Sequence, residues 1–486
     1  MSENTSTATD DLAYLTATEA RALFEKRELS PVELLEAVAT RAERAEGAVN
    51  AFTEQLRDEA RAQAREAEAR FLGKGGGAPR PLEGIPVATK EKHAIEGRSL
   101  TEGSLARQGQ IADFTAPVIE RIQQAGGIIH ARTATPEFSA HGHTVTKLWG
   151  TTRNPWNRAF SPGGSSGGSG AALAAGTTTL ASGSDIGGST RMPAALNGVV
   201  GFKAPYGRVP GVAPLSADFY RGDGPMARSV DDTITFQNVL AGPDPRDHTS
   251  LRPKLELPYA FESLKGTRIG LSVTLGDYDV HPEVEAAVRA SAAALAEAGA
   301  EIVEIELPWK RAETRAAAHA HFKQIFGQLL AETDAAHHDD LTPYVQDFVT
   351  AVSGPDVPTF LDGLRIETRM QRELAESMAG CTALLAPTTA VPGWGADSWL
   401  TEPYSYQGHT PGEVLYDLAL TVPFNIANRC PVLSVPTGIH AQGTGLPIGA
   451  QIIGHTYDDA AVFRVGKALE TLRPWAYDTA ATRPVL

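Results

Sequence analysis

Ser189 lies in a segment whose residue types could carry out nucleophilic catalysis. It ends the run Asp185-Ile186-Gly187-Gly188-Ser189. Glycines permit positive φ angles and the close approach of a ligand, and successive backbone N–H groups around a serine hydroxyl can stabilise negative charge on a carbonyl oxygen. We therefore predict that Ser189 is a nucleophile and that the N–H groups of Ile186, Gly187, Gly188 and Ser189 form an oxyanion hole. An isolated Gly-Gly-Ser is more often a structural turn, so the surrounding sequence must support this prediction.

The run belongs to a longer stretch, residues 162–208, in which glycine and serine are frequent. A flexible linker would continue as glycine and serine alone. Here the segments AALAAG and VVGF alternate with the glycines and supply apolar side chains that a core can bury. We therefore predict that this stretch is ordered.

The same stretch resembles the signature of the amidase signature family. PGGSSGGSGAALAAG is followed by GSDIGGSTRMPAALNGVVGFKAPYGR, as in that family. PLEGIPVATKE is similar to the lysine-bearing segment of the family, with Glu91 where Asp is commoner. Further similar pieces are ATPEF at 134–138, TVPFN at 421–425 and LPIGAQIIG at 446–454. Because these pieces span most of the chain, the protein is identified as a member of this family.

The resemblance implies three catalytic residues. They are Ser189 as nucleophile, Ser165 in a cis peptide after Gly164, and Lys90 as base; Ser166 is rejected as the bridging serine. The mechanism that it implies uses neither a metal nor a cofactor.

Lys90 must be neutral to act as a base, and burial lowers the pKa of a lysine from about 10.4. Our hypothesis is that Lys90 accepts a proton from Ser165 while Ser165 accepts one from Ser189. Attack on the amide carbonyl then leaves an acyl-enzyme, which water hydrolyses by the same relay.

Several residues have competing interpretations. Alone, Lys90 would be a surface lysine, and Lys92 is a rival that could face the same way on an extended segment; the motif favours Lys90. Arg191 and Asp185 flank the nucleophile and are predicted to form a structural ion pair rather than to act in catalysis.

Histidine pairs raise the alternative of a metal site. They lack a third ligand at a recognisable spacing, so no metal is predicted; they are His141 and His143, His319 and His321, and His337 and His338 followed by Asp339 and Asp340. A phosphate-binding loop is also set aside, because neither G-x-x-x-x-G-K-[ST] nor G-x-G-x-x-G after a strand is present.

Composition excludes several partners. The chain has 486 residues and a formal net charge of −15, so a nucleic-acid or anionic-membrane surface is not expected. The polar, acidic first residues and the lack of an apolar run of about 18 residues predict neither a signal peptide nor a membrane helix. We expect a cytoplasmic protein in which Cys381 and Cys430 are free thiols.

The fold implied by the resemblance is α/β, with a central twisted mixed β-sheet covered on both faces by helices. We expect residues 1–10 to be a disordered tail and 11–486 to be a single amidase domain. Within it, residues 309–380 should form a helical region, less like the family, that lies near the active site and shapes the substrate pocket.

Local signals support this fold. Capping boxes begin helices at Thr16 with Glu19 and at Ser30 with Glu33, and a charged helix should end near residue 70. Periodicity and punctuation predict further helices over 115–124, 171–175, 230–240, 282–298 and 458–472. Strands are predicted over 85–89, 127–131, 267–273, 301–307, 384–387, 432–436 and 448–453.

Three functions are compatible with the residues. The first is an amidase that hydrolyses a small carboxamide, anilide, hydrazide or oligoamide. The alternative is the glutaminase-type subunit of a tRNA amidotransferase complex, and a third is a binding module without catalysis, which the intact Lys90, Ser165 and Ser189 argue against. Aromatic residues at 393–410 together with Phe138 and Phe326 suggest an apolar or aromatic acyl group, and a homodimer is the default expectation.

Overall fold

Strands from most of the chain assemble into one mixed sheet. The computed structural model describes residues 11–408, 412–441, 443–475, 477, 479 and 482–486, and the predicted tail at 1–10 lies outside them. Within these residues eleven strands follow the order β1-β3-β2-β6-β8-β7-β12-β13-β11-β9-β10. The strands are β1 Phe52–Gln55, β2 Pro86–Lys90, β3 Ile128–Thr133, β6 Leu180–Asp185, β7 Val200–Lys203, β8 Gly222–Ala227, β9 Arg268–Leu271, β10 Glu301–Glu304, β11 Ala383–Pro387, β12 Val432–Ile439 and β13 Pro447–Gly454. A separate hairpin pairs β4 Val145–Thr146 with β5 Gly150–Thr151.

Strand directions decide which residues meet at one edge of the sheet. β2 runs parallel to β3 and β6, whereas β8 runs antiparallel to β6 with Asp185 opposite Gly222. The carboxyl ends of β2 and β6 therefore lie at the same edge as the amino end of β8. Lys90 ends β2 and Asp185 ends β6, so the lysine and the segment that leads to Ser189 are neighbours.

Helices cover both faces of the sheet. Side chains alternate along a strand, so Ile452 packs in the cluster of α5, α8, α9 and α15, whereas Ile453 packs on the opposite face with α10, α13 and α14. The helices are α2 Ala17–Lys26, α3 Pro31–Val49, α4 Arg57–Phe71, α5 Pro117–Gln124, α6 Gly167–Ala174, α7 Arg191–Asn197, α8 Val230–Leu240, α9 Pro282–Glu297, α10 Arg311–Gln324, α11 Phe326–His337, α12 Pro343–Ser353, α13 Phe360–Ser377, α14 Pro423–Ile426 and α15 Asp459–Leu472. The predicted α/β class with a helix-covered mixed sheet is confirmed.

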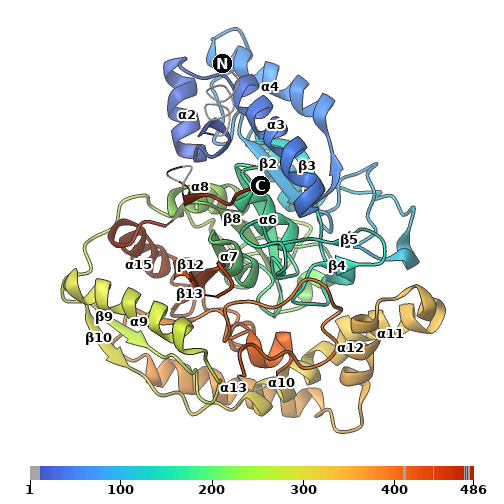
Figure 1. Cartoon of the computed structure of the whole chain (residues 1–486), viewed down its shortest axis with the longest axis vertical. Helices are drawn as coiled ribbons and strands as arrows, with labels where there is room; N and C mark the ends of the chain where they lie inside the picture. Colours follow the sequence, from blue (N-terminus) through green and yellow to red (C-terminus); the bar gives the residue numbers. More distant parts are fainter. Residues whose placement is uncertain (1–10, 409–411, 442, 476, 478, 480–481) are drawn as a thin grey trace.

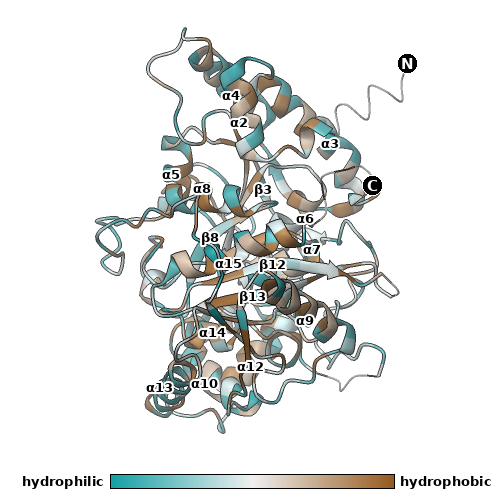
Figure 2. Ribbon diagram, turned by 90° about the vertical axis from the view of Figure 1, so that its left-hand side faces the viewer, coloured by the Kyte–Doolittle hydropathy of each residue, from teal (hydrophilic) through white to brown (hydrophobic). Residues whose placement is uncertain are grey.

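The helices α10 to α13 lie together at one end of the molecule, with the N-terminal helices α2 to α4 at the other (Figure 1). Hydropathy follows this layering, because the central strand β13 is hydrophobic while the peripheral helix α13 carries many hydrophilic residues (Figure 2). Among the described residues, no helix combines the length and apolar character that crossing a membrane requires.

Local sequence signals placed most elements correctly. Both predicted capping boxes, Thr16 with Glu19 and Ser30 with Glu33, are present. The strands β1, β6, β7 and β8 and the helix α7 were not predicted, and α6 begins at Gly167 rather than at residue 171. Its glycines are helical because the helix packs against the backbone of other segments: a Cβ atom at Gly168 would lie 2.5 Å from the backbone nitrogen of Ala134. Glycine here serves close packing and not a loop.

Candidate active site

Lys90 is buried among serine hydroxyls. Its side chain is 0% exposed, and its Nζ lies 2.6 Å from Ser165 Oγ, 3.1 Å from Ser166 Oγ and 3.0 Å from Ser184 Oγ. A neutral amine has two N–H donors and one lone pair. Three hydroxyl partners therefore satisfy it fully, with one of them donating to the nitrogen.

The surroundings of Lys90 favour the neutral amine. Burial lowers the pKa of Lys90 well below its usual value, and the nearby positive charge of Lys92 lowers it further. Within the described residues, no carboxylate forms an ion pair with Lys90. Charge on this nitrogen would therefore be poorly compensated.

Ser165 and Ser189 belong to two loops that contact each other. The Gly164–Ser165 peptide bond is cis, as the resemblance implied. The N–H of Ser166 donates to the carbonyl oxygen of Ser189 at 3.0 Å, which joins the loops. Ser189 is 5% exposed and lines a pocket, and its hydroxyl has no hydrogen-bond partner in the described part of the chain. The Ser189 hydroxyl is thus free to meet a ligand.

Asp185 fixes the loop that carries Ser189. Its carboxylate accepts hydrogen bonds from Gly188 N at 2.8 Å, from Arg191 Nη2 at 2.9 Å and from Asn425 Nδ2 at 2.9 Å. Burial alone would raise the pKa of the Asp185 carboxyl, but Arg191 and these hydrogen bonds outweigh it, so this pKa lies well below its usual range. The predicted pairing of Asp185 with Arg191 is present.

Arg191 connects the loop to the C-terminal part of the chain. Its guanidinium donates to Thr421 O at 3.0 Å, to Gln451 Oε1 at 3.0 Å and to Asn425 Oδ1 at 2.7 Å. Thr421 and Asn425 come from the TVPFN piece and Gln451 from LPIGAQIIG. Sequence reasoning noted these pieces only as a resemblance, and the structure gives them a physical role in holding the Ser189 loop.

The four backbone N–H groups from Ile186 to Ser189 are not equivalent. The N–H of Gly188 is occupied by Asp185 Oδ1. Those of Ile186, Gly187 and Ser189 have no acceptor among the residues that the structure describes. Gly188 could contribute to the predicted oxyanion hole only if its N–H were shared between Asp185 and the oxyanion. The N–H groups of the other three residues are the available donors.

The pocket beside Ser189 is lined mainly by apolar side chains. It is formed by Ser139, Ala140, His141, Ile186, Gly187, Ser189, Phe322, Phe326, Phe348 and Leu415. Phe348 lies 5.8 Å from Phe322 and 5.6 Å from Phe326, measured between ring centroids. Three phenylalanines from α10, α11 and α12 thus face the nucleophile candidate.

Only part of the predicted aromatic set reaches this pocket. Phe326 does, but Phe138 is buried under Arg107, whose guanidinium carbon lies 4.9 Å from its ring. In the 393–410 loop, of which 409 and 410 lie outside the described residues, Trp394 and Tyr404 pack in a cluster with Leu418 instead. Sequence reasoning missed Phe322 and Phe348 because nothing local distinguishes a pocket-facing phenylalanine from a core one.

His141 is a further pocket residue that the sequence singled out only as part of a possible metal site. Burial lowers its pKa to about 4, so the imidazole is neutral. Its ring stacks on Tyr344 with centroids 4.8 Å apart. It therefore offers the pocket a neutral polar group. Among the described residues, no three His, Cys, Asp or Glu side chains are grouped closely enough to hold a metal.

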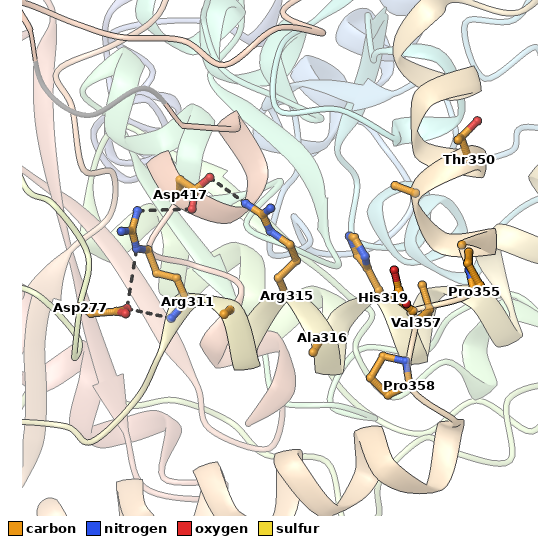
Figure 3. Close-up of a pocket in the computed structure, with 14 residues that line it drawn as sticks. Asp277, Arg311, Arg315, Ala316, His319, Thr350, Pro355, Val357, Pro358 and Asp417 are labelled. Atoms are coloured by element: carbon orange, nitrogen blue, oxygen red, sulfur yellow. Dashed lines mark hydrogen bonds and ion pairs between the residues drawn. The ribbon is translucent and has the colours of Figure 1, made fainter.

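A second cavity, of about 670 Å³, lies between α10 and the C-terminal end of α12. Figure 3 shows Arg311 and Arg315 directed toward Asp417, at 3.4 and 2.8 Å, with His319 one turn further along α10. Arg311 also pairs with Asp277 at 3.7 Å, so the two arginines and the two aspartates neutralise one another. His319 faces this cavity and Phe322, one turn on, faces the pocket beside Ser189, so α10 forms a wall of both.

The class of protein follows from these features and from comparison with known proteins. A helix-covered mixed sheet places a buried lysine, a serine after a cis peptide bond and a serine in a glycine-rich loop at one edge. The family model described as Amidase matches residues 33–463. The chain belongs to the amidase signature family, whose members act on carbon–nitrogen bonds.

Individual relatives have more than one activity. Over 478 residues the chain is 34% identical to the "Acylamidase" of Rhodococcus erythropolis, covering 96% of this chain and 97% of the relative. Over 479 residues it is 35% identical to a glutamyl-tRNA(Gln) amidotransferase subunit from Synechococcus sp. (strain CC9605), covering 93% and 94%. The crystal structure of a bacterial aryl acylamidase superposes with a TM-score of 0.88 at 28% identity, covering 97% and 99% of the two chains.

Proposed function

We propose that this protein is an amidase that hydrolyses a linear amide bond of a small molecule through an acyl-enzyme on Ser189. The Ser189 hydroxyl attacks the carbonyl carbon and transfers its proton to Ser165, whose own proton passes to neutral Lys90. Ser165 then protonates the leaving nitrogen as the carbon–nitrogen bond breaks and takes back a proton from Lys90, which is neutral again. Water attacks the ester by the same relay and releases the acid, restoring Ser189.

The observation that carries this proposal is the environment of Lys90. A fully buried amine with no carboxylate partner among the described residues, 2.6 Å from Ser165 Oγ, is suited to receive a proton. Its lowered pKa keeps a fraction of the amine neutral near physiological pH, as a general base requires. The N–H groups of Ile186, Gly187 and Ser189 are proposed to stabilise the tetrahedral oxyanion.

The pocket supports an apolar or aromatic group on the substrate. Phe322, Phe326 and Phe348 line the pocket together with Ser189, and aromatic pairs add to the gain from burying apolar area. The similarity to an acylamidase and to an aryl acylamidase agrees with such a substrate. We therefore place anilides and related aryl amides first among the candidate substrates.

The test compares hydrolysis of acetamide, benzamide, acetanilide and a hydrazide by the wild-type protein, by Ser189→Ala and by Ser291→Ala. Ser291 is a buried serine of α9 and controls for the loss of a buried hydroxyl. Activity that disappears only in Ser189→Ala supports the proposal. Activity retained by Ser189→Ala would refute it.

A second variant tests the pocket. Phe348→Ala should lower kcat/KM for acetanilide by about 10-fold or more, because apolar contacts of this size are worth about 1–3 kcal/mol, while acetamide is affected less. Leu361→Ala is the control, since Leu361 is 58% exposed on α13. Equal losses for both substrates would contradict an aryl pocket.

The alternative is the glutaminase-type subunit of a tRNA amidotransferase, favoured by the 35% identity to one such protein. Glutamine carries an ammonium and a carboxylate, whereas the described lining of the pocket beside Ser189 contains no carboxylate for that ammonium. Glutamine hydrolysis that requires added partner proteins, with no activity on aryl amides, would establish this alternative.

A further inference from the structure

Two basic side chains flank the segment that leads to Ser189. β2 is parallel to β6, and Lys92 follows the end of β2 by two residues. β8 is antiparallel to β6 with Asp185 opposite Gly222, and Arg221 immediately precedes β8. Lys92 and Arg221 therefore approach the end of β6 from its two neighbouring strands, at the edge where the Ser189 loop begins.

Neither basic group has a hydrogen-bond partner within the described residues. The Arg221 side chain is 14% exposed, its nearest carboxylate oxygen is Asp218 Oδ2 at 4.0 Å, and its Nε is buried without an acceptor. Lys92 is half-buried. After burial, the positive charge of Arg221 is the main influence that lowers the pKa of Lys92. Two neighbouring cations thus lack a hydrogen-bonded anion.

Three acidic groups surround the two cations without forming a hydrogen bond to either of them. The three carboxylates whose charges act on Lys92 each have another partner: Asp218 accepts from His321 Nε2 at 2.7 Å, Asp223 lies 3.2 Å from His93 Nε2, and Glu102 lies 3.2 Å from Arg107 Nη1. Asp218 Oδ2 and Asp223 Oδ1 have no hydrogen-bond partner of their own, but among the described residues no carboxylate oxygen lies within hydrogen-bond distance of Lys92 or Arg221. An incoming carboxylate would supply the charge-assisted hydrogen bonds that the two cations lack.

The position relates these cations to the reacting centre. Continuing the β6–β8 register by one residue places Arg221 opposite Ile186, and opposite residues of antiparallel strands have Cα atoms about 5 Å apart. Ile186 lines the pocket with Ser189 and offers a free N–H. The backbone of Arg221 therefore lies beside that of a pocket residue, so an anion held by the Arg221 guanidinium would lie within about the length of an arginine side chain of this pocket residue.

We propose that Lys92 and Arg221 form a subsite for a carboxylate of the substrate. This inference rests on the proposed amidase function and makes it more specific. The substrate is an amide with an apolar group against Phe322 and Phe348 and a carboxylate a short chain away from the scissile bond. The carboxylate belongs either to the acyl half or to the amine half of that amide.

Two matched pairs of substrates test the subsite and distinguish these halves. N-Phenylsuccinamate carries its carboxylate in the acyl half and is compared with butyranilide; hippurate carries it in the amine half and is compared with N-ethylbenzamide. In the wild-type enzyme, kcat/KM for one of the two carboxylates should exceed that of its neutral partner by about 10-fold or more, since hydrogen bonds to charged groups have this strength.

The variants Lys92→Met and Arg221→Met should each reduce that ratio severalfold, mainly through KM, and Arg221→Lys should restore part of it. Lys74→Met is the control for removing a positive charge, because Lys74 is exposed on a distant loop, and it should leave the ratio unchanged. Inhibition of the wild-type enzyme by 3-phenylpropionate, expected to be about 10-fold stronger than by 3-phenylpropanol, needs no variant.

The results separate the two proposals. Ser189-dependent hydrolysis of the neutral anilides with no preference for either carboxylate, and equal inhibition by the acid and the alcohol, overturns the subsite while leaving the amidase function intact. A carboxylate preference that Lys92→Met and Arg221→Met leave unchanged also overturns it. If none of the four amides is hydrolysed, the proposed function is refuted, and the subsite is refuted with it.

Discussion

Replacing Lys90 with methionine tests the proposed relay most directly. Methionine keeps an apolar side chain of similar length and removes the amine. The change deprives Ser165 Oγ and Ser184 Oγ of their hydrogen bonds to Lys90 Nζ, and neither hydroxyl has another partner in the described structure. Ser166 retains its hydrogen bond with Ser184 N at 3.2 Å.

The expected size of both effects follows from these contacts. Loss of a general base lowers kcat/KM by about 10²- to 10⁴-fold, equivalent to about 2.7–5.4 kcal/mol in the transition state. Two buried hydroxyls without partners cost about 1–3 kcal/mol each, so unfolding becomes easier by up to about 6 kcal/mol. Removing a buried amine offsets part of that loss, because the amine no longer has to be desolvated.

The assay measures kcat/KM for an anilide, the fraction of enzyme acylated by an activated phenyl ester, and the thermal unfolding temperature. Lys203→Met is a matched control. Lys203 is a second buried lysine, 1% exposed, whose Nζ lies 2.5 Å from Asn428 Oδ1 and 2.9 Å from Cys430 O. Burial lowers the pKa of Lys203 to about 7. In the described structure Lys203 forms no hydrogen bond with Ser165, Ser166 or Ser184, the three serines around Lys90.

We expect both variants to lose stability but only Lys90→Met to lose more than about 100-fold in activity. A folded Lys90→Met protein with activity within about 10-fold of wild type would refute the relay. Equal losses in the two variants would show that the effect is structural and would also remove the support for Lys90 as a base.

Two further predictions concern pH and the nucleophile loop. Because the proposed base is neutral Lys90, kcat/KM should fall as the pH drops below the pKa of Lys90 in the folded protein and should be level above that pKa. Lys92→Met removes a repelling positive charge and so raises the pKa of Lys90. The midpoint of the pH–rate profile should therefore move to higher pH. A pH–rate profile with an unmoved midpoint would contradict this. Gly188→Ala should abolish most activity and lower the unfolding temperature, because its Cβ would lie 2.0 Å from Thr421 Oγ1 at a φ of +118°. The control Gly97→Ala has a φ of +79° with no atom within 4 Å, and a comparable loss there would assign the effect to backbone strain alone.

Local structure could be predicted from the sequence because its causes are local. A capping box such as Thr16 with Glu19 forms between residues three apart, and alternating apolar residues define strands wherever they occur. The pieces that resemble the amidase signature family likewise identified Lys90, Ser165 and Ser189 as the candidate site. The structure brings the lysine and the two serines to one edge of the sheet.

The contacts that distinguish this site depend on tertiary structure. Arg191 reaches Asn425 and Gln451, which lie more than 200 residues away in the chain, and no local pattern specifies such partners. The same holds for the N–H of Gly188, whose use by Asp185 depends on the loop conformation.

The sequence by itself therefore determined the family, the candidate catalytic residues and most of the helices and strands, since these follow from short motifs and periodicity. Only the tertiary structure decided that Phe322 and Phe348 face the nucleophile candidate, and that Lys92 and Arg221 belong to the segments next to the two strands that flank β6. Strand order and register bring these residues together, and both are fixed by packing across the whole sheet rather than by neighbours in the chain.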